Sequence, residues 1–145
     1  MGLSQEEFDK LREERRKVRG EDDAAREAQM GIDRESILAL EEQIGEELDT
    51  SLTVKKFVSG LPAMIGVRCP KPVEYKRFAQ KINASKATPD TKRTELESLG
   101  KLCLVYPAEA EMRDRLLEEF PALLLQVGTT ANRLAELAKE DEGKD

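Results

Sequence analysis

The sequence predicts a mainly α-helical protein, a small domain of about five or six helices with one short β-hairpin. Two observations lead to this fold class. Apolar residues recur at helical spacing in several segments, and each segment is bounded by a capping residue, a glycine or a proline. Charged residues make up 37% of the 145 residues and aromatic residues only 4%, with no tryptophan. This balance is typical of helices with long solvated faces.

A first helix is expected to begin at the N-terminus, where Ser4 can act as a cap. Glu7, three residues later, completes a capping box. The helix is expected to run to Arg19 and to stop at Gly20. Its apolar stripe is weak because Arg15 interrupts it, and it consists of Phe8, Leu11 and Val18.

The next segment, EDDAAREAQMG over residues 21–31, is polar and poorly patterned, so we expect a linker or a frayed helix. Asp33 is then expected to cap a second helix that runs to about Leu48. Residues 1–30 would thus form a charged N-terminal arm, weakly helical or disordered, and residues 31–140 the helical domain. Two alternatives stay open for the arm, which is either a partner-binding helix or simply disordered.

The stretch SLTVKKFVSGLPAMIGVRCP differs from its surroundings because β-branched and aromatic residues cluster around a turn signal. It predicts a β-hairpin near residues 53–69, with 53–58 paired to 63–69. Two strands alone are marginally stable in water, so the hairpin must pack on helices or be extended by another chain. Lys55 and Lys56 at its edge either recognise a partner or protect the edge from unwanted pairing.

Helical spacing returns after this hairpin. One helix is expected from Pro72, which suits the first helical position, with an apolar face of Tyr75, Phe78, Ala79 and Ile82. Thr88 is expected to cap the next helix, with Pro89 at its first position. The apolar face of that helix carries Leu96, Leu99 and Cys103.

Two prolines are expected to mark the last helix junctions. Pro107 should end one helix and open the next, because its ring removes a donor and restricts the residue before it. Pro121 should do the same before a final amphipathic helix over about residues 122–139. The tail, residues 141–145, is expected to be mobile.

No pattern in the sequence indicates a catalytic, metal or cofactor site. Histidine is absent, and so are the phosphate-binding, dinucleotide-binding, nucleophile-elbow and zinc-protease motifs. We therefore expect no enzyme and no cofactor. Cys69 and Cys103 are expected to be reduced thiols of a cytoplasmic protein, with a disulfide between them as the alternative. No apolar run is long enough for a membrane span, so no membrane partner is expected.

The charges are segregated along the chain. Residues 1–50 carry a net charge of −8, residues 51–104 one of +7, and residues 105–145 one of −5. The acidic ends can lie against the basic middle, within one chain or between copies, or the basic middle can bind an acidic partner. We favour as a docking surface a basic strip of Lys55, Lys56, Lys71, Lys76, Arg77 and Lys81, and we expect the chain to form a homo-oligomer.

Binding to nucleic acid is not expected as the main role. The basic cluster ERRKVR at residues 14–19 is flanked by acidic residues, which weaken attraction to phosphate. Tyr75 and Phe78 have the spacing of core residues, so stacking on bases is the poorer interpretation.

The order of the expected elements, together with short segments near the C-terminus, suggests a family. IGVRCP leads into the helix PVEYKRFAQKIN, and LGKLCLVYP is followed by a charged helix that ends in EEFPAL and by a final amphipathic helix. Over about residues 60–140 this layout resembles the tail assembly chaperones of long-tailed bacteriophages and related phage-like elements. Residues 1–30 lie outside the resemblance.

The resemblance implies a non-enzymatic role in the host cell cytoplasm. Such chaperones coat the long helical tape measure protein, help to recruit tail tube protein, and leave before the tail is finished. Amphipathic helices suit this task because they can bind a partner helix lengthwise, and repeated weak contacts add up while still allowing release. The alternatives are a small helical regulatory or nucleic-acid-binding protein, or a structural subunit of the particle.

Overall fold

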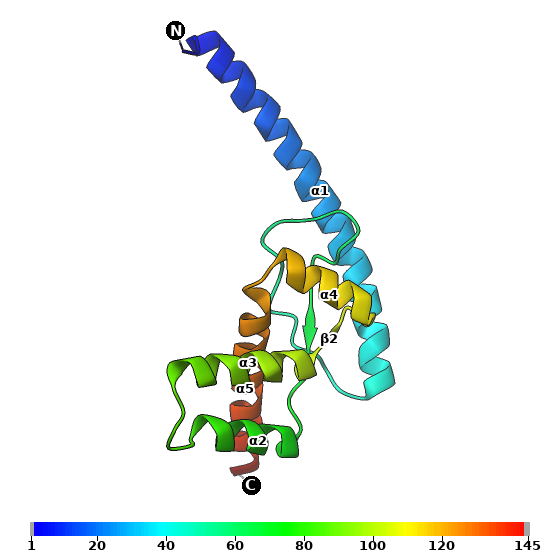
Figure 1. The fold of residues 1–145 in the computed structure, drawn as a ribbon. Coiled ribbons are helices and arrows are strands. Elements are labelled where there is room, and N and C mark those ends of the chain that lie inside the picture. Colours follow the sequence, from blue (N-terminus) through cyan, green and yellow to red (C-terminus); the bar gives the residue numbers. More distant parts are fainter. Residues whose placement is uncertain (1, 144–145) are drawn as a thin grey trace.

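The computed structural model describes the backbone of residues 2–143 and the side chains up to residue 139. Within these residues the chain forms five helices and two short strands, in the order α1 (Gln5–Ile44), β1 (Gly66–Val67), α2 (Pro72–Ile82), α3 (Pro89–Cys103), β2 (Leu104–Tyr106), α4 (Ala110–Glu119) and α5 (Leu123–Gly143) (Figure 1). The predicted fold class, a small mainly α-helical domain with one short antiparallel strand pair, is confirmed.

Helix α1 is one uninterrupted helix of 40 residues, and its N-terminal half projects from the rest of the molecule (Figure 1). Ser4 caps it as predicted and accepts a hydrogen bond from the backbone N–H of Glu7 at 3.2 Å. The predicted stop at Gly20 and the predicted linker over residues 21–31 are both wrong, because the helix runs through them. A glycine inside a helix costs only about 1 kcal/mol, which the neighbouring alanine, glutamate and arginine residues offset.

Helix α1 ends before Gly45, whereas the sequence predicted an end near Leu48. Gly45 adopts a left-handed conformation with φ of 76°, and its N–H donates to the carbonyl oxygen of Glu41 at 2.9 Å. Glycine takes this conformation without steric penalty. The Glu41 carboxylate then accepts from the N–H of Leu48 at 2.7 Å, which fixes the turn of the chain. Asp33, the predicted cap of a second helix, lies inside α1 instead.

The strand pair differs from the predicted hairpin in its partner, because β1 pairs antiparallel with β2. The predicted pairing of residues 53–58 with 63–69 is present only as an isolated antiparallel bridge between Thr53 and Met64. Residues 61–67 are all buried. Their backbone groups therefore need hydrogen-bond partners within the protein, and β2, distant in the sequence, supplies some of them.

The main core is built around a close approach of α3 and α5. A Cβ atom on Gly128 would lie 1.9 Å from the carbonyl oxygen of Leu96, and one on Gly100 would lie 2.6 Å from that of Leu124. Only glycine permits such contact between two backbones. The surrounding core gathers buried side chains from most of the other elements, among them Val54, Ile65, Val67, Phe78, Leu99, Leu116, Val127 and Ala131.

The two proline junctions have different outcomes. The prediction that Pro107 separates two helices is wrong, because α3 ends at Cys103 and β2 comes between. The sequence Leu-Val-Tyr before a proline disfavours helix and suits a strand. Pro121 lies between α4 and α5, as predicted. Helix α5 continues into the predicted tail, residues 141–145, of which 144–145 lie outside the described residues.

Candidate protein-binding surfaces

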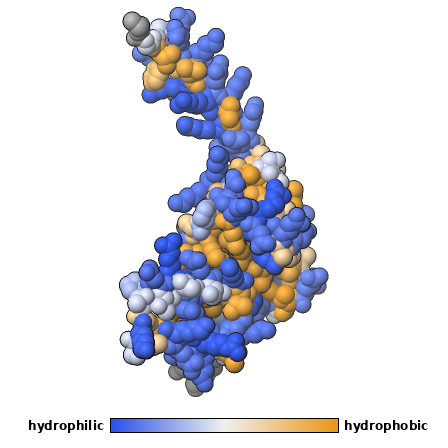
Figure 2. Space-filling model, viewed as in Figure 1, coloured by the Kyte–Doolittle hydropathy of each residue, from blue (hydrophilic) through white to orange (hydrophobic). Residues whose placement is uncertain are grey.

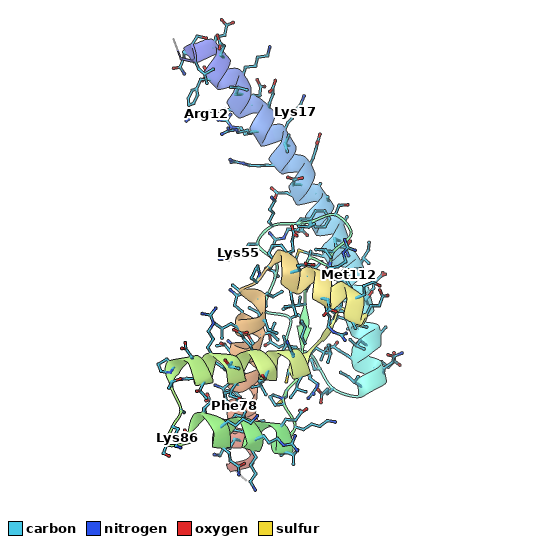
Figure 3. The ribbon with its side chains drawn as sticks, in the orientation of Figure 1. Arg12, Lys17, Lys55, Phe78, Lys86 and Met112 are labelled. Carbon is cyan, nitrogen blue, oxygen red and sulfur yellow. The ribbon has the colours of Figure 1, made fainter. Side chains whose placement is uncertain are left out.

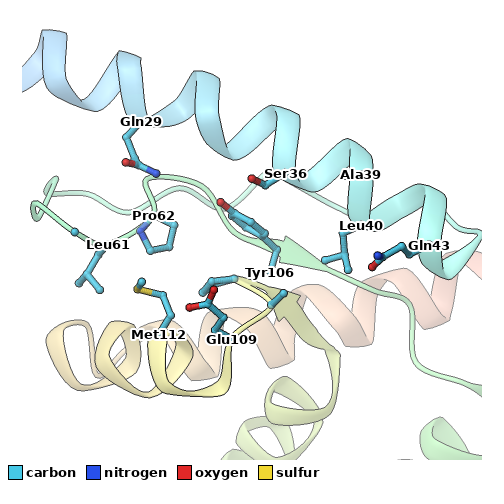
Figure 4. Close-up of a pocket in the computed structure, with 13 residues that line it drawn as sticks. Gln29, Ser36, Ala39, Leu40, Gln43, Leu61, Pro62, Tyr106, Glu109 and Met112 are labelled. Atoms are coloured by element: carbon cyan, nitrogen blue, oxygen red, sulfur yellow. The ribbon is translucent and has the colours of Figure 1, made fainter.

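An open groove of about 450 Å³ lies between the C-terminal half of α1 and the body of the molecule (Figure 4). Helix α1 forms one wall, the segment 60–62 and Tyr106 form the floor, and residues 107–112 form the other wall. The side chains that line it are a mixture of apolar and polar groups, chiefly Gln29, Leu40, Leu61, Pro62, Glu109 and Met112. Concave sites with an apolar lining and a few polar groups are typical of binding sites.

Asp33 holds the walls and floor of this groove together. It is fully buried, and its two carboxylate oxygens accept four hydrogen bonds. Oδ1 accepts from the hydroxyl of Tyr106 at 2.6 Å and from the side-chain amide of Gln29 at 3.0 Å. Oδ2 accepts from the backbone N–H groups of Ala63 at 2.7 Å and Met64 at 2.9 Å. One side chain of α1 thus positions both the 63–64 segment and β2.

The Asp33 network is suited to a structural task. Burial, together with the hydrogen bond to Asp33, raises the pKa of Tyr106 well above its ordinary value, so the phenol keeps its proton. A carboxylate has about four lone-pair sites, and in Asp33 all of them are engaged. The network therefore fixes the shape of the groove and leaves no free acceptor for acid–base chemistry.

Sequence reasoning missed this network, although a signal for it was present. Asp33 occupies the face of α1 that otherwise carries Met30, Ile37 and Leu40, since helical neighbours on one face are three or four residues apart. A charged residue on an apolar face is rarely buried unless it has partners. That anomaly pointed to a buried hydrogen-bonded carboxylate, whereas the partner Tyr106, 73 residues away, could not be identified.

The projecting segment of α1, residues 5–25, forms a second surface, and every residue in it is exposed. Its apolar side chains are open to solvent, with exposed fractions of 38% for Phe8, 44% for Leu11 and 56% for Val18. Figure 2 shows this segment as mainly hydrophilic with apolar side chains towards its tip. The guanidinium of Arg12 lies 4.1 Å from the centroid of the Phe8 ring, a cation–π contact. These exposed apolar side chains make the projecting segment a candidate contact surface.

The predicted basic strip is divided into two parts. Its six members are all exposed. Lys71 precedes α2, and Lys76, Arg77 and Lys81 lie on it, with Lys81 Nζ 3.6 Å from a carboxylate oxygen of Glu95. Lys55 and Lys56 belong to the loop before β1, and Figure 3 shows Lys55 at the opposite end of the body from Phe78 of α2. The structure thus brings four of the six residues together around one helix.

The start of α2 is fixed by an ion pair. The guanidinium of Arg68 donates to both oxygens of Glu74, at 2.7 and 3.0 Å, and the backbone N–H of Lys71 also donates to Glu74 at 2.8 Å. The hydrogen bond from Arg68 lowers the pKa of Glu74 to about 2.

The two cysteines are free, and burial raises the pKa of the Cys103 thiol to about 12. Burial also raises the pKa of the Cys69 thiol, so neither thiol is activated as a nucleophile.

Among the side chains that the structure describes, those of residues 2–139, no three His, Cys, Asp or Glu groups gather in a way that could bind a metal ion. In the same part of the chain no helix combines the length and apolar character needed to span a membrane. Comparison with protein-family models, curated proteins and solved structures finds no match to this chain.

Proposed function

We propose that this chain is a non-enzymatic assembly chaperone of a long phage tail, which binds tape measure protein in the host cell cytoplasm. The observation that carries the proposal is the groove between α1 and the body. Apolar side chains line both walls and the floor of the groove, namely Leu40, Met112 and Leu61. Its polar lining is largely uncharged, so an apolar side chain can enter without displacing an ion pair.

A helical partner suits this groove. An amphipathic helix presents apolar side chains at three- and four-residue intervals, and such helices dock into apolar grooves. A groove of about 450 Å³ accepts only a few side chains, so each contact is weak. Many copies along one long helical protein would bind strongly together and still release it one by one. These properties match the coating and release that the family resemblance implies.

The groove can be tested by filling it. Ala108 is exposed and lines the groove, whereas Ala110 is exposed and does not line it. We expect Ala108→Arg to weaken binding to tape measure protein, the proposed partner, by at least about tenfold, because the new side chain occupies the groove. Ala110→Arg is the matched control and should bind as the wild type does.

The measurement is co-purification of the co-expressed pair, followed by titration of the purified components. Equal binding by Ala108→Arg and wild type would overturn the groove as the docking site. Persistence of the protein in purified, finished particles would overturn the chaperone role, because it would indicate a structural subunit. Binding to DNA that weakens steeply with salt would instead indicate the nucleic-acid-binding alternative.

The basic residues around α2 give the proposal a second test. Lys76, Arg77 and Lys81 are exposed on one helix, and an acidic tail tube protein or another acidic partner would be attracted to them. We expect the triple reversal to glutamate to slow assembly and to abolish its dependence on salt. Unchanged assembly would show that this helix is not a docking surface. The double reversal of Lys55 and Lys56 tests the separate part of the strip in the same assay.

A further inference from the structure

The charges of the projecting segment of α1 follow a regular pattern. Each of three glutamates is followed five residues later by an arginine, which gives the pairs Glu7 and Arg12, Glu14 and Arg19, and Glu21 and Arg26. Side chains five residues apart do not meet on one helix, where only spacings of three and four bring neighbours together. In the described part of the chain, the ion pairs closer than 4.0 Å all involve residues beyond the projecting segment. Within one copy of the chain, the glutamates and arginines of this pattern therefore do not form ion pairs with each other.

The same residues fit a heptad repeat. If Phe8 is position a, Leu11 and Val18 are both position d, so the exposed apolar side chains form a seam. The three glutamates then all occupy position g, and the three arginines all occupy position e. In a parallel two-stranded coiled coil, position g of one helix faces position e of the next heptad in the partner helix, five residues further on. The charges are thus complementary between two copies of this segment.

We propose that the projecting segment pairs with that of a second copy as a parallel, in-register coiled coil. An antiparallel pair would set glutamates against glutamates and arginines against arginines, so the charges select the parallel arrangement. The residues of two of the three glutamate–arginine sets are exposed, and among them Arg12 also contacts the Phe8 ring. In the third, Arg26 Nη2 donates to the Thr53 hydroxyl at 3.3 Å, so the coiled coil ends where the body begins.

The body leaves the seam of the projecting segment accessible, because every residue from 5 to 25 is exposed. Beyond this segment the a positions Gln29 and Ser36 line the groove against the body, so the pairing is confined to the projecting segment. Arg15 and Asp22 occupy two a positions and weaken the seam, because polar groups there reduce stability while they specify register. We therefore expect a dimer that dissociates at micromolar concentrations.

Charge reversal with rescue tests the proposal on the full chain. One variant carries Glu7→Arg and Glu14→Arg, and the other carries Arg12→Glu and Arg19→Glu. Each variant alone places like charges at g and e, so we expect its dimerisation to weaken at least about tenfold in sedimentation velocity experiments. A mixture of the two restores every pair and should form a heterodimer at least as tightly as the wild type. Rescue cannot arise from misfolding of either variant.

Orientation is tested by oxidation of the Leu11→Cys variant. In a parallel in-register pair the two new thiols face each other, so a disulfide-linked dimer should form rapidly, whereas the wild type with its two native cysteines provides the background. A wild-type chain that stays monomeric at about 100 μM, dimerisation insensitive to the charge reversals, or no cross-link above background would each overturn the proposal. Because Ala108→Arg leaves the seam untouched, failure of the groove and failure of the coiled coil are distinguishable.

Discussion

The two halves of α1 belong to one continuous helix but have opposite surroundings. In the projecting segment, residues 5–25, every side chain is exposed. In the packed segment, residues 26–44, Asp33 is fully buried and Ile37 is 4% exposed. Phe8 and Leu11 have the same three-residue spacing as Ile37 and Leu40, yet only the second pair has neighbours from the body to cover it.

This difference separates helix formation from burial. Capping at Ser4 and a run of residues with high helix propensity are sufficient for the helix to continue through Gly20, because propensity acts locally. Burial of one face depends on which other segments lie beside it. An apolar stripe in this chain therefore marks either a face that the chain itself covers or a face that a partner can cover.

The largest effect is expected where the packed segment is anchored. Asp33→Ala would leave the backbone N–H groups of Ala63 and Met64 and the hydroxyl of Tyr106 without their acceptor. We expect it to lower the free energy of unfolding by about 3–5 kcal/mol, since each buried unsatisfied group costs about 1–3 kcal/mol. Urea denaturation at a concentration that keeps the chain monomeric measures this.

The matched change in the projecting segment is Asp22→Ala. Asp22 is exposed on the same helix, so its replacement should change the free energy of unfolding by no more than about 0.5 kcal/mol. Similar effects for the two aspartates would show that the packed segment is not held by Asp33.

A smaller effect is expected from a pair of neighbouring apolar residues. Ile37 is 4% exposed and Leu38 is 66% exposed. Ile37→Ala should destabilise the fold by about 2–4 kcal/mol through lost burial and a residual cavity, while Leu38→Ala should be nearly neutral. Thermal unfolding of both variants makes the comparison. A larger loss for Leu38 than for Ile37 would contradict the orientation of α1 on the body.

The third effect is a pH dependence of the free energy of unfolding, which arises from an ion pair in the body of the molecule. Arg68 lowers the pKa of Glu74 from 4.5 to about 2, so this ion pair contributes its full stability above about pH 4.5 and loses it as the pH falls towards 2. Glu74→Gln should therefore lower the free energy of unfolding by about 1.5 kcal/mol at neutral pH. Urea denaturation at several pH values should also show that the stability of this variant falls less steeply below pH 4.5. If the variant and the wild type lost stability equally below pH 4.5, the Arg68–Glu74 ion pair would not be a source of the pH dependence.

The smallest effect concerns the helix itself. A Cβ atom on Gly20 would meet nothing within 4 Å. Gly20→Ala should thus raise the helical content of the projecting segment and stabilise it by about 0.5–1 kcal/mol. Hydrogen exchange of amides on either side of residue 20 would report this as slower exchange. Faster exchange would mean that the segment is not helical in solution.

Much of the local structure was predictable because its signals are local. Ser4, Pro72 and Thr88 begin helices as expected, and Pro121 separates two helices. Their effects depend on caps and backbone geometry within a few residues. The predicted helix end at Gly20 is wrong because the high helix propensity of the surrounding residues outweighs the low propensity of one glycine.

The errors elsewhere have a non-local cause. The segment around residues 104–106 was assigned to a helix and its junction, but it is a strand because β1 needs a hydrogen-bonding neighbour. The sequence predicted the basic strip as one surface, but its residues lie in two places because a loop and a helix position them separately. Neither outcome depends on the residues alone, since each requires knowing which segments meet.

The amino-acid sequence by itself determined the helical character of this protein, most of its helix starts and the charge pattern of its N-terminal segment. These features arise from interactions between residues at most a few positions apart. Only the tertiary structure decided that Asp33 and Tyr106, 73 residues apart, hold the groove open with a 2.6 Å hydrogen bond. It likewise decided that α1 is covered over one half and bare over the other. Both follow from long-range packing, because the local sequence of one segment does not identify the distant segment that packs against it.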